Sequence, residues 1–242
     1  MGGHRRARSV ALLLTTFALG CLEAPPKAGN GTGDGDGGTA GADGGGVVET
    51  DGGLCEVIVS NRFDSLAWAS VAQPAAFVDR AAGWTRVRST PSTDTYAYGD
   101  IHTVAAEPLE GSLLTVEVDG PITSVIGEVG ISWQNVGADD SYQLEVADGQ
   151  LRARRTSGSA DETDACISSC PEYSAIEHAR LRLREDQGTV RYQVASEAGE
   201  WIDVGSAPAT ELAYQVVFYA GATGPGSGDL TVLGAEWLAC DD

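Results

Sequence analysis

The sequence predicts an all-β domain arranged as a two-sheet antiparallel β-sandwich of the jelly-roll type. Three observations lead to this prediction. Apolar and polar residues alternate with a period of two in many short segments, turn-forming residues separate those segments, and no window carries a helical stripe longer than three turns. Alternation marks strands that are buried on one face, and ten or more of them in about 190 residues can form two packed sheets.

Strands are expected where the alternation is sharpest. These segments are residues 115–119, 129–134, 142–146, 178–184, 190–194 and 202–204. The turns between them are expected at residues 119–121, 147–149, 186–188, 198–199 and 224–226. Residues 212–220 are apolar on nearly both faces, which predicts a central strand of the sandwich. Residues 64–100 show no clear pattern, and residues 70–82 fit either a short helical turn or irregular structure.

The N-terminus has the features of a secretory signal. Basic residues precede an apolar stretch at residues 10–20, which is too short to span a bilayer. The stretch ends at Cys21 and resembles the lipobox of bacterial lipoproteins, in which the cysteine is acylated and becomes the mature N-terminus. Leu22, rather than an aspartate, follows the cysteine, and by the same resemblance this implies the outer membrane. Ordinary signal cleavage that leaves Cys21 as a spare thiol is the alternative.

Residues 22–53 are predicted to form a disordered tether. Twelve of these 32 residues are glycine and none is aromatic, so the segment cannot bury enough surface to offset its ordering entropy. From residue 54 the composition changes to that of a folded domain. We therefore expect a signal peptide at 1–21, a tether at 22–53 and one β-sandwich domain at 54–242.

The charge of the chain excludes several kinds of partner. Lysine and arginine total 15 against 35 aspartate and glutamate, for a formal net charge of −20 at pH 7. Such a chain repels phosphate backbones, so no nucleic-acid partner is expected. An anionic bilayer surface repels it as well, so membrane attachment is expected through the lipid anchor only.

The five cysteines predict an exported domain with two disulfides. If the lipobox uses Cys21, four remain, and these allow three connectivities. The first and last strands of a sandwich are often neighbours, which favours Cys55–Cys240 and leaves Cys166–Cys170. A metal site made of Cys166, Cys170 and His178 is the alternative, but it lacks a fourth ligand.

Three segments together resemble the concanavalin A-like lectin/glucanase superfamily, especially its laminin-G-like and secreted bacterial members. They are residues 127–155, with an acidic turn after Trp133, residues 178–206, with alternating arginine and leucine, and the tryptophan-bearing strand at 228–238. The resemblance covers about residues 112–238 and implies two curved antiparallel sheets. Many members bind carbohydrate, some with a calcium ion, while others are enzymes or adhesion modules. No other cofactor is implied.

The acid motif of the glucanases in this superfamily is incomplete here. Those enzymes carry Glu-x-Asp-x-x-Glu on one strand, which places the acids in one cleft. The nearest match is Glu117, Asp119 and Ile122, where isoleucine replaces the second glutamate. The resemblance therefore does not imply hydrolysis, and no Gly-x-Ser-x-Gly elbow suggests serine chemistry.

A ligand face is expected from planar hydrogen-bonding side chains beside an aromatic ring. The candidate residues are Arg152, Arg154, Arg182, Gln193 and Trp201, which form one face if their strands are neighbours. Cross-strand ion pairing on an ordinary solvated face is the alternative. Asp139 and Asp140 lie in the turn where some relatives place metal-binding acids. Aspartate is also a common turn-forming residue, and this role alone explains both residues.

These observations predict a lipid-anchored outer-membrane protein with a noncatalytic module that binds carbohydrate or another surface polymer. The alternative is a structural or protein-interaction envelope lipoprotein without a glycan site. A glycan hydrolase is a third possibility and requires two carboxylates about 5–9 Å apart in a cleft.

Overall fold

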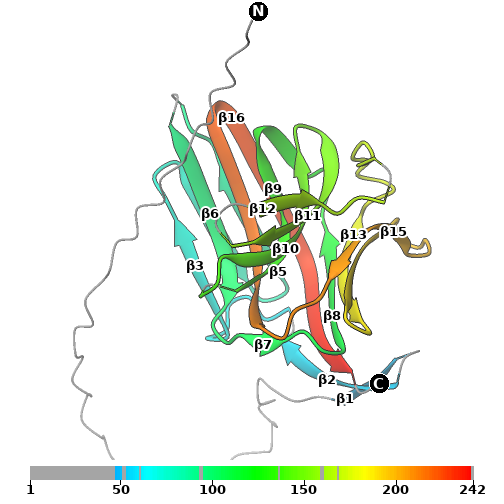
Figure 1. Cartoon of the computed structure of the whole chain (residues 1–242). Coiled ribbons are helices and arrows are strands. Elements are labelled where there is room, and N and C mark those ends of the chain that lie inside the picture. Colours follow the sequence, from blue (N-terminus) through cyan, green and yellow to red (C-terminus); the bar gives the residue numbers. More distant parts are fainter. Residues whose placement is uncertain are drawn as a thin grey trace, which may run out of the picture. The chain divides into compact units, whose positions relative to one another are not determined.

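The computed structural model describes residues 47–50, 53–59, 61–92, 95–135, 137–158, 161–167 and 169–240. The predicted signal, Cys21 and the tether up to residue 46 lie outside this range. Every regular element in the described part is a β-strand, and all strand pairs are antiparallel (Figure 1). The predicted all-β antiparallel sandwich is therefore confirmed. The described residues contain no helix long and apolar enough to cross a membrane.

The strands form two layers that share one long strand, β16 (Ala213–Cys240). The first sheet has the order β3 (Trp68–Ala72), β6 (Tyr96–Thr103), β16, β9 (Thr123–Asn135), β10 (Asp140–Ala147), β11 (Gln150–Ser157) and β12 (Asp161–Asp164). The second has the order β4 (Ala76–Ala81), β5 (Trp84–Ser89), β16, β8 (Ser112–Val118), β13 (Arg180–Asp186), β14 (Thr189–Ala195) and β15 (Ile202–Pro208). The remaining strands are β1 (Val47–Thr50), β2 (Gly53–Val59) and β7 (Glu107–Pro108).

Strand β16 passes from one layer to the other. Its first half lies between β6 and β9, and its second half pairs with β5, β8 and β2. The register with β9 shifts between Ala222 and Ser227, where the chain folds over, as the orange and red arms of β16 show in Figure 1. The predicted central strand at 212–220 falls in the first half and is central, as expected.

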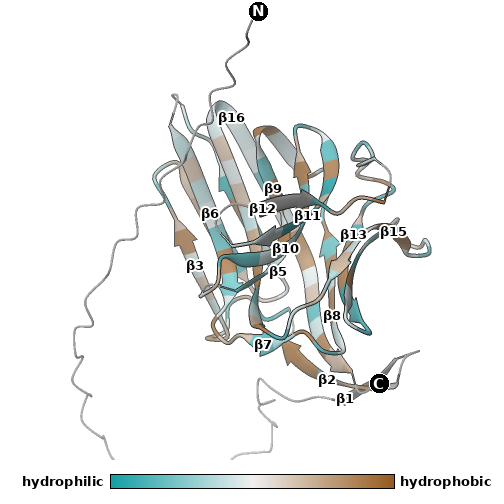
Figure 2. Ribbon diagram, in the orientation of Figure 1, coloured by the Kyte–Doolittle hydropathy of each residue, from teal (hydrophilic) through white to brown (hydrophobic). Residues whose placement is uncertain are grey.

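The core lies between the two sheets. Hydropathy alternates along the strands, so each sheet presents one apolar side to the other sheet (Figure 2). The largest fully buried side chains come from both layers; they include Trp133, Tyr142 and Phe218 of the first sheet and Trp237, Leu114 and Tyr192 of the second. Trp133, Trp237 and Tyr142 are therefore core residues.

Two parts of the chain differ from the sequence-based expectation. Residues 70–82 hold no helical turn, because β3 and β4 occupy most of the segment. These short strands lie at the outer edges of their sheets and expose apolar residues such as Val71 and Phe77, which hides the alternation. In addition, β1 and the start of β2 lie within the range 22–53 that was expected to be tether.

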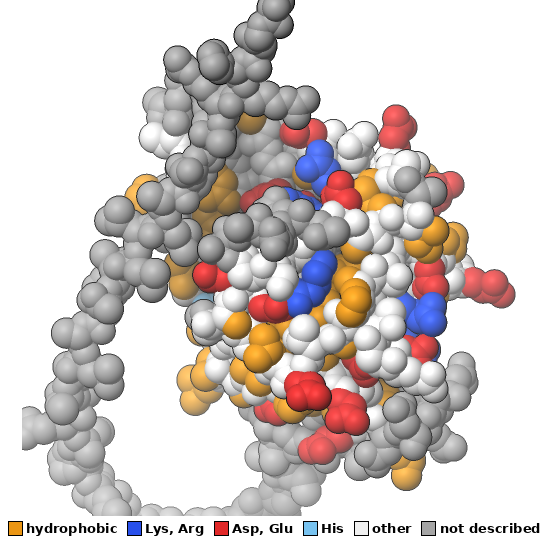
Figure 3. Space-filling model, in the orientation of Figure 1, with side chains coloured by type: hydrophobic (Ala, Val, Ile, Leu, Met, Phe, Trp, Pro, Cys, Tyr) orange, Lys and Arg blue, Asp and Glu red, His pale blue; other side chains and the backbone are white. Residues whose placement is uncertain are grey.

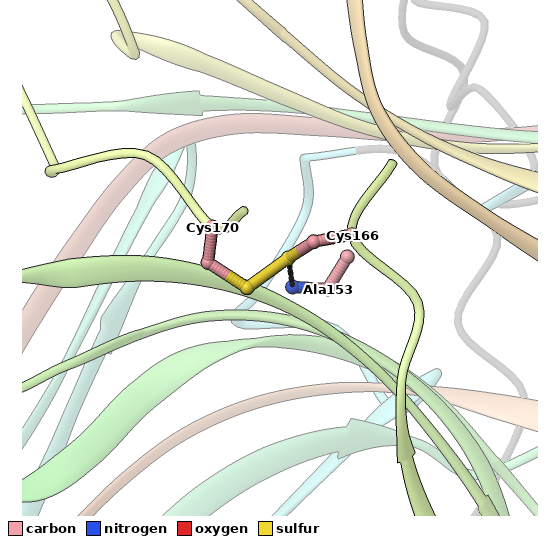
Figure 4. The surroundings of a disulfide bond; sticks show 3 residues. All are labelled: Ala153, Cys166 and Cys170. Carbon is pink, nitrogen blue, oxygen red and sulfur yellow. Dashed lines mark hydrogen bonds between the residues drawn. A yellow bond between two sulfur atoms is a disulfide. The ribbon is translucent and has the colours of Figure 1, made fainter. Parts of the chain in front are cut away.

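Both disulfides pair as expected. Cys55–Cys240 joins β2 to the end of β16, two strands that are also hydrogen-bonded neighbours. Cys166–Cys170 closes a small loop after β12, and the main-chain N–H of Ala153 points to Cys166 Sγ at 3.5 Å (Figure 4). This contact fastens the loop to β11.

Candidate functional site

Each sheet has one side that faces away from the core, and the two sides differ in chemistry. We call the outward side of the first sheet the tyrosine face, after its aromatic row of Tyr96, Tyr98 and Tyr219. We call the outward side of the second sheet the arginine face, after Arg180, Arg182 and Arg184 of β13. These two faces are the candidate binding surfaces.

The five residues predicted to form one ligand face are divided between these two surfaces. Arg152 and Arg154 lie on the tyrosine face, because β11 pairs with β10 and β12. Arg182, Gln193 and Trp201 lie on or beside the arginine face, because β13 pairs with β8 and β14. The two arginine-bearing strands are therefore not neighbours, and the expected single face does not form.

The aromatic row of the tyrosine face crosses from β6 to β16. The rings of Tyr96 and Tyr98 have centroids 6.4 Å apart with planes 21° from parallel. The rings of Tyr98 and Tyr219 are 6.3 Å apart and 26° from parallel. Tyr96 is 50% exposed and Tyr219 only 5%, so the row descends from the surface into the sheet. Nearly parallel rings of this kind offer an apolar platform with hydroxyl groups at its edge.

Charged groups surround this row. Glu145 on β10 accepts hydrogen bonds from the Tyr219 hydroxyl at 2.5 Å and from Arg154 Nη1 at 3.1 Å. Arg154 also lies 3.5 Å from Glu128 of β9. The Glu145 side chain is fully buried, whereas that of Glu128 is 40% exposed. Glu128 is therefore the carboxylate that a ligand could reach.

The three tyrosines are held in the protonated form. Burial raises the pKa of Tyr98 and Tyr219 far above the usual value, and the nearby carboxylates of Asp100 and Glu145 add to the effect. Burial and then the charge of Glu128 raise the pKa of Tyr96. Their hydroxyl groups thus remain hydrogen-bond donors throughout the physiological range of pH.

The β6 side of the tyrosine face adds one further polar pair. His102 Nδ1 lies 2.6 Å from Asp100 Oδ1, and Asp100 stands opposite Tyr219 in the register. Gln215 of β16 donates to the main-chain carbonyl of Thr103 at 2.6 Å. The face therefore combines aromatic rings with imidazole, carboxylate and guanidinium groups.

Sequence reasoning missed the aromatic row, although a signal was present. In β6 the outward positions are Tyr96, Tyr98, Asp100 and His102, which alternate with buried residues. This is the period-two pattern of a half-buried strand with an aromatic and charged outer side. It falls within residues 64–100, whose edge strands obscure the pattern around it.

The arginine face holds the other predicted residues. The guanidinium carbon of Arg182 lies 3.8 Å from the centre of the Trp201 ring, and that of Arg180 lies 4.9 Å from it. Gln193 donates to Asp203 at 2.6 Å. Glu117 and Asp119 are exposed, while Ile122 is buried at 4% exposure. Ile122 therefore supplies no carboxylate at the position where the glucanase motif has its second glutamate.

Metal ligands are not grouped in the described part of the chain. It contains no cluster of three or more His, Cys, Asp or Glu side chains that could hold a metal ion. Cys166 and Cys170 are bonded to each other, so the alternative site with His178 is wrong. Asp140 pairs with Arg155 at 2.6 Å rather than facing an open loop.

Comparison with known proteins identifies the fold but no family by sequence. No family model matches the chain, and no curated relative matches it. Among solved structures, it is similar to a Bacillus licheniformis β-glucanase, at 10% identity over 76% of this chain and 98% of that chain, with a TM-score of 0.55. It is also similar to the VIP36 exoplasmic/lumenal domain in its Ca²⁺/Man3GlcNAc-bound form, at 13% identity, 76% and 89% coverage and a TM-score of 0.50.

A third similar structure comes from work on endo-acting O-glycanases of the human gut microbiota that initiate mucin breakdown. It is 13% identical over 76% of this chain and all of that chain, with a TM-score of 0.55. The described domain has the concanavalin A-like jelly-roll fold. At these identities the likeness establishes the fold alone, and the function depends on the chemistry of the domain's own two faces.

Proposed function

We propose that this chain is a noncatalytic carbohydrate-binding module and that the tyrosine face is its glycan site. The observation that carries the proposal is the row of three nearly parallel tyrosine rings beside Glu128. Apolar sugar faces pack on aromatic rings, and sugar hydroxyl groups donate to carboxylates. The β-glucanase and the Man3GlcNAc-bound lectin domain share the fold, which supports the same class of ligand.

The contacts of Glu145 favour binding over hydrolysis. Two carboxylates, Glu128 and Glu145, lie within 3.5 Å of the same Arg154 nitrogen, so they are close enough for a glycosidase pair. However, both oxygens of Glu145 are taken up by Tyr219 and Arg154, and its side chain is fully buried. These contacts hold the Glu145 carboxylate away from a glycosidic bond bound at the surface, which favours binding over hydrolysis.

Hydrolysis remains the second candidate, because the pair exists on a face that contains aromatic rings. The two functions are separated by measuring binding and reducing-end release on the same polysaccharides. Noncatalytic binding predicts saturable retention with no new reducing ends. Release that Glu128→Gln abolishes would establish the hydrolase instead.

The location of the module is also a proposal. The signal-like segment and Cys21 support export and acylation, and the two disulfides suit an oxidising compartment outside the cytoplasm. The module would then be tethered to the cell envelope, at the outer membrane, where polysaccharides are available. Mass measurement of the membrane-extracted chain tests this, because two or three acyl chains on Cys21 give a mass that signal cleavage alone does not.

The binding proposal is tested by screening the full chain against neutral glycans and insoluble polysaccharides, with calcium and then with chelator. Tyr98→Ala removes the middle ring of the row, and the matched control is Tyr173→Ala, which removes a half-buried tyrosine elsewhere. We expect Tyr98→Ala to abolish binding and the control to retain it. Absence of binding in both conditions would favour an envelope protein partner or a structural role.

A further inference from the structure

Strand β13 carries three arginines, Arg180, Arg182 and Arg184, that have no acidic partner among the residues that the structure describes. Arg182 lies between Thr115 of β8 and Gln193 of β14, neither of which is charged. Glu117 lies opposite Arg180, but Arg180 donates to the main-chain carbonyls of Ser196 and Gly199 instead. Within the described part of the chain, none of the three arginines forms an ion pair. This is unexpected in a chain with 35 acidic and 15 basic residues.

Arg182 is fixed in position while most of its donors stay free. Its guanidinium lies over the Trp201 ring at 3.8 Å, and its Nε donates to Thr115 Oγ1 at 3.3 Å. Its two Nη groups have no hydrogen-bond partner among the described residues. A planar fork held in this way is ready to bind both oxygens of a carboxylate or two oxygens of a sulfate.

The surroundings of Arg182 disfavour its positive charge. Burial, together with the charges of Arg184 and Arg180, lowers the pKa of Arg182 to about 10. Arg191 on the same face is different, because it contacts both Asp186 and Asp203. The described residues thus supply counter-charges for Arg191 and none for Arg182, and an anion from outside would supply the missing one.

A hollow beside Arg182 can hold the rest of such a ligand. It has a volume of about 280 Å³ and is lined by Asn61, Thr115, Glu117, Gly234, Ala235 and Glu236. Thr115 belongs both to this hollow and to the contacts of Arg182. Glu117 and Glu236 repel a second anionic group but accept hydrogen bonds from hydroxyl groups. A ligand that suits both Arg182 and the hollow has one anionic group and several hydroxyl groups.

We infer that the arginine face is a second binding site, for an acidic saccharide whose carboxylate or sulfate is bound by Arg182 and Arg184. The sugar ring occupies the neighbouring hollow and donates its hydroxyl groups to Glu117 and Glu236. Trp201 acts as a positioning residue, because it holds the guanidinium of Arg182 in place. This second site uses no residue of the tyrosine face, so a negative result at one site does not count against the other.

The test measures binding of three oligosaccharides to the full chain by calorimetry at pH 7. The probes are a galactose-containing trisaccharide with a single galacturonic acid residue, a galactose disaccharide with a single sulfate group, and a neutral galactose trisaccharide. We expect one or both acidic probes to bind at the arginine face, and the one that binds identifies the anionic group. Arg182→Gln and Arg184→Gln should each weaken that binding by about tenfold or more.

Two controls make the result decisive. Arg88→Gln removes the same charge from the same sheet, but Arg88 is already paired with Asp79 at 3.8 Å, so acidic-probe affinity should change by less than about twofold. Arg182→Lys keeps the charge but loses the fork, and it should bind more weakly than the unmodified chain. The inference is overturned if neither acidic probe binds, if the neutral probe binds the arginine face equally well, or if Arg182→Gln and Arg184→Gln bind normally.

Discussion

Asp140 and Arg155 form an ion pair of 2.6 Å at the edge of the core. The guanidinium of Arg155 also lies over the Tyr142 ring at 4.2 Å, and the second oxygen of Asp140 accepts a hydrogen bond from the Tyr214 hydroxyl. The side chains of Asp140 and Arg155 are only 7% and 11% exposed. Two charges are thus held away from water, and each depends on the other.

Removing one member of this pair should destabilise the domain strongly. Asp140→Ala leaves the guanidinium of Arg155 buried without a counter-charge, so the free energy of unfolding should fall by about 3–5 kcal/mol. Urea unfolding under oxidising conditions measures the change. The double variant Asp140→Ala, Arg155→Met should lose less than the sum of the two single changes. A loss below about 1 kcal/mol for Asp140→Ala would show that the pair contributes little.

The two disulfides should contribute unequally to stability. Cys55–Cys240 closes a loop with a sequence separation of 185, whereas Cys166–Cys170 closes one of 4. By the chain-entropy model, the first constrains the unfolded chain by about 5 kcal/mol and the second by about 2 kcal/mol. Replacing both cysteines of one pair by alanine, and then the other, tests this in thermal unfolding. Equal losses for the two pairs would contradict the loop-length argument.

The sequence predicted where the strands lie along the chain better than it predicted which strands pair with each other. Alternation shows which side of a strand faces the core, and the buried Trp133 and Tyr142 lie in the alternating segments 129–134 and 142–146 that predicted strands. It does not show which strand lies alongside, because β13 pairs with β8, more than sixty residues earlier in the chain. Arg154 and Arg182 each belong to an outward side, yet those sides lie on different sheets.

The candidate site was predictable only in part for the same physical reason. The aromatic row joins Tyr98 of β6 to Tyr219 of β16, two residues that become neighbours only when the sheet forms. The spacing of Tyr98 and Tyr219 along the sequence does not show that the two residues are neighbours. The cysteine pairing was different, because the first and last strands of a sandwich tend to be adjacent and Cys55 and Cys240 mark both ends.

Gly221→Ala should weaken glycan binding without unfolding the domain. A Cβ at this position would lie 2.4 Å from the hydroxyl oxygen of Tyr96, which is the far end of a flexible side chain. The Tyr96 ring must therefore shift from its observed position beside Tyr98, which disrupts the proposed platform. Binding of neutral glycans by the variant should match that of Tyr96→Ala. The matched control is Gly234→Ala on the same strand, where the nearest atom is 3.7 Å away; unchanged binding in Gly221→Ala would argue against the aromatic row.

Protonation of His178 should make the domain less stable below neutral pH. The imidazole is 7% exposed, and its Nδ1 accepts a hydrogen bond of 3.0 Å from the main-chain N–H of Ser174. Burial lowers the pKa of His178, and the charge of Glu177 offsets this only in part. The unfolded chain therefore takes up a proton before the folded one does. The contribution to stability is complete above the usual histidine pKa of about 6.5 and is lost as the pH falls toward the lowered pKa of the folded state.

Urea unfolding between pH 7.5 and pH 5.5, chosen to bracket the usual histidine pKa of about 6.5, measures this effect. We expect the free energy of unfolding to decrease as the pH falls, and His178→Gln to flatten that part of the dependence. His102→Gln is the matched control, because it removes the imidazole that faces Asp100 on the tyrosine face. Protonation of Nδ1 would break the hydrogen bond that it accepts from the main-chain N–H of Ser174, so the folded state resists taking up the proton. If the pH dependence of the free energy of unfolding persists unchanged in His178→Gln, other groups cause it.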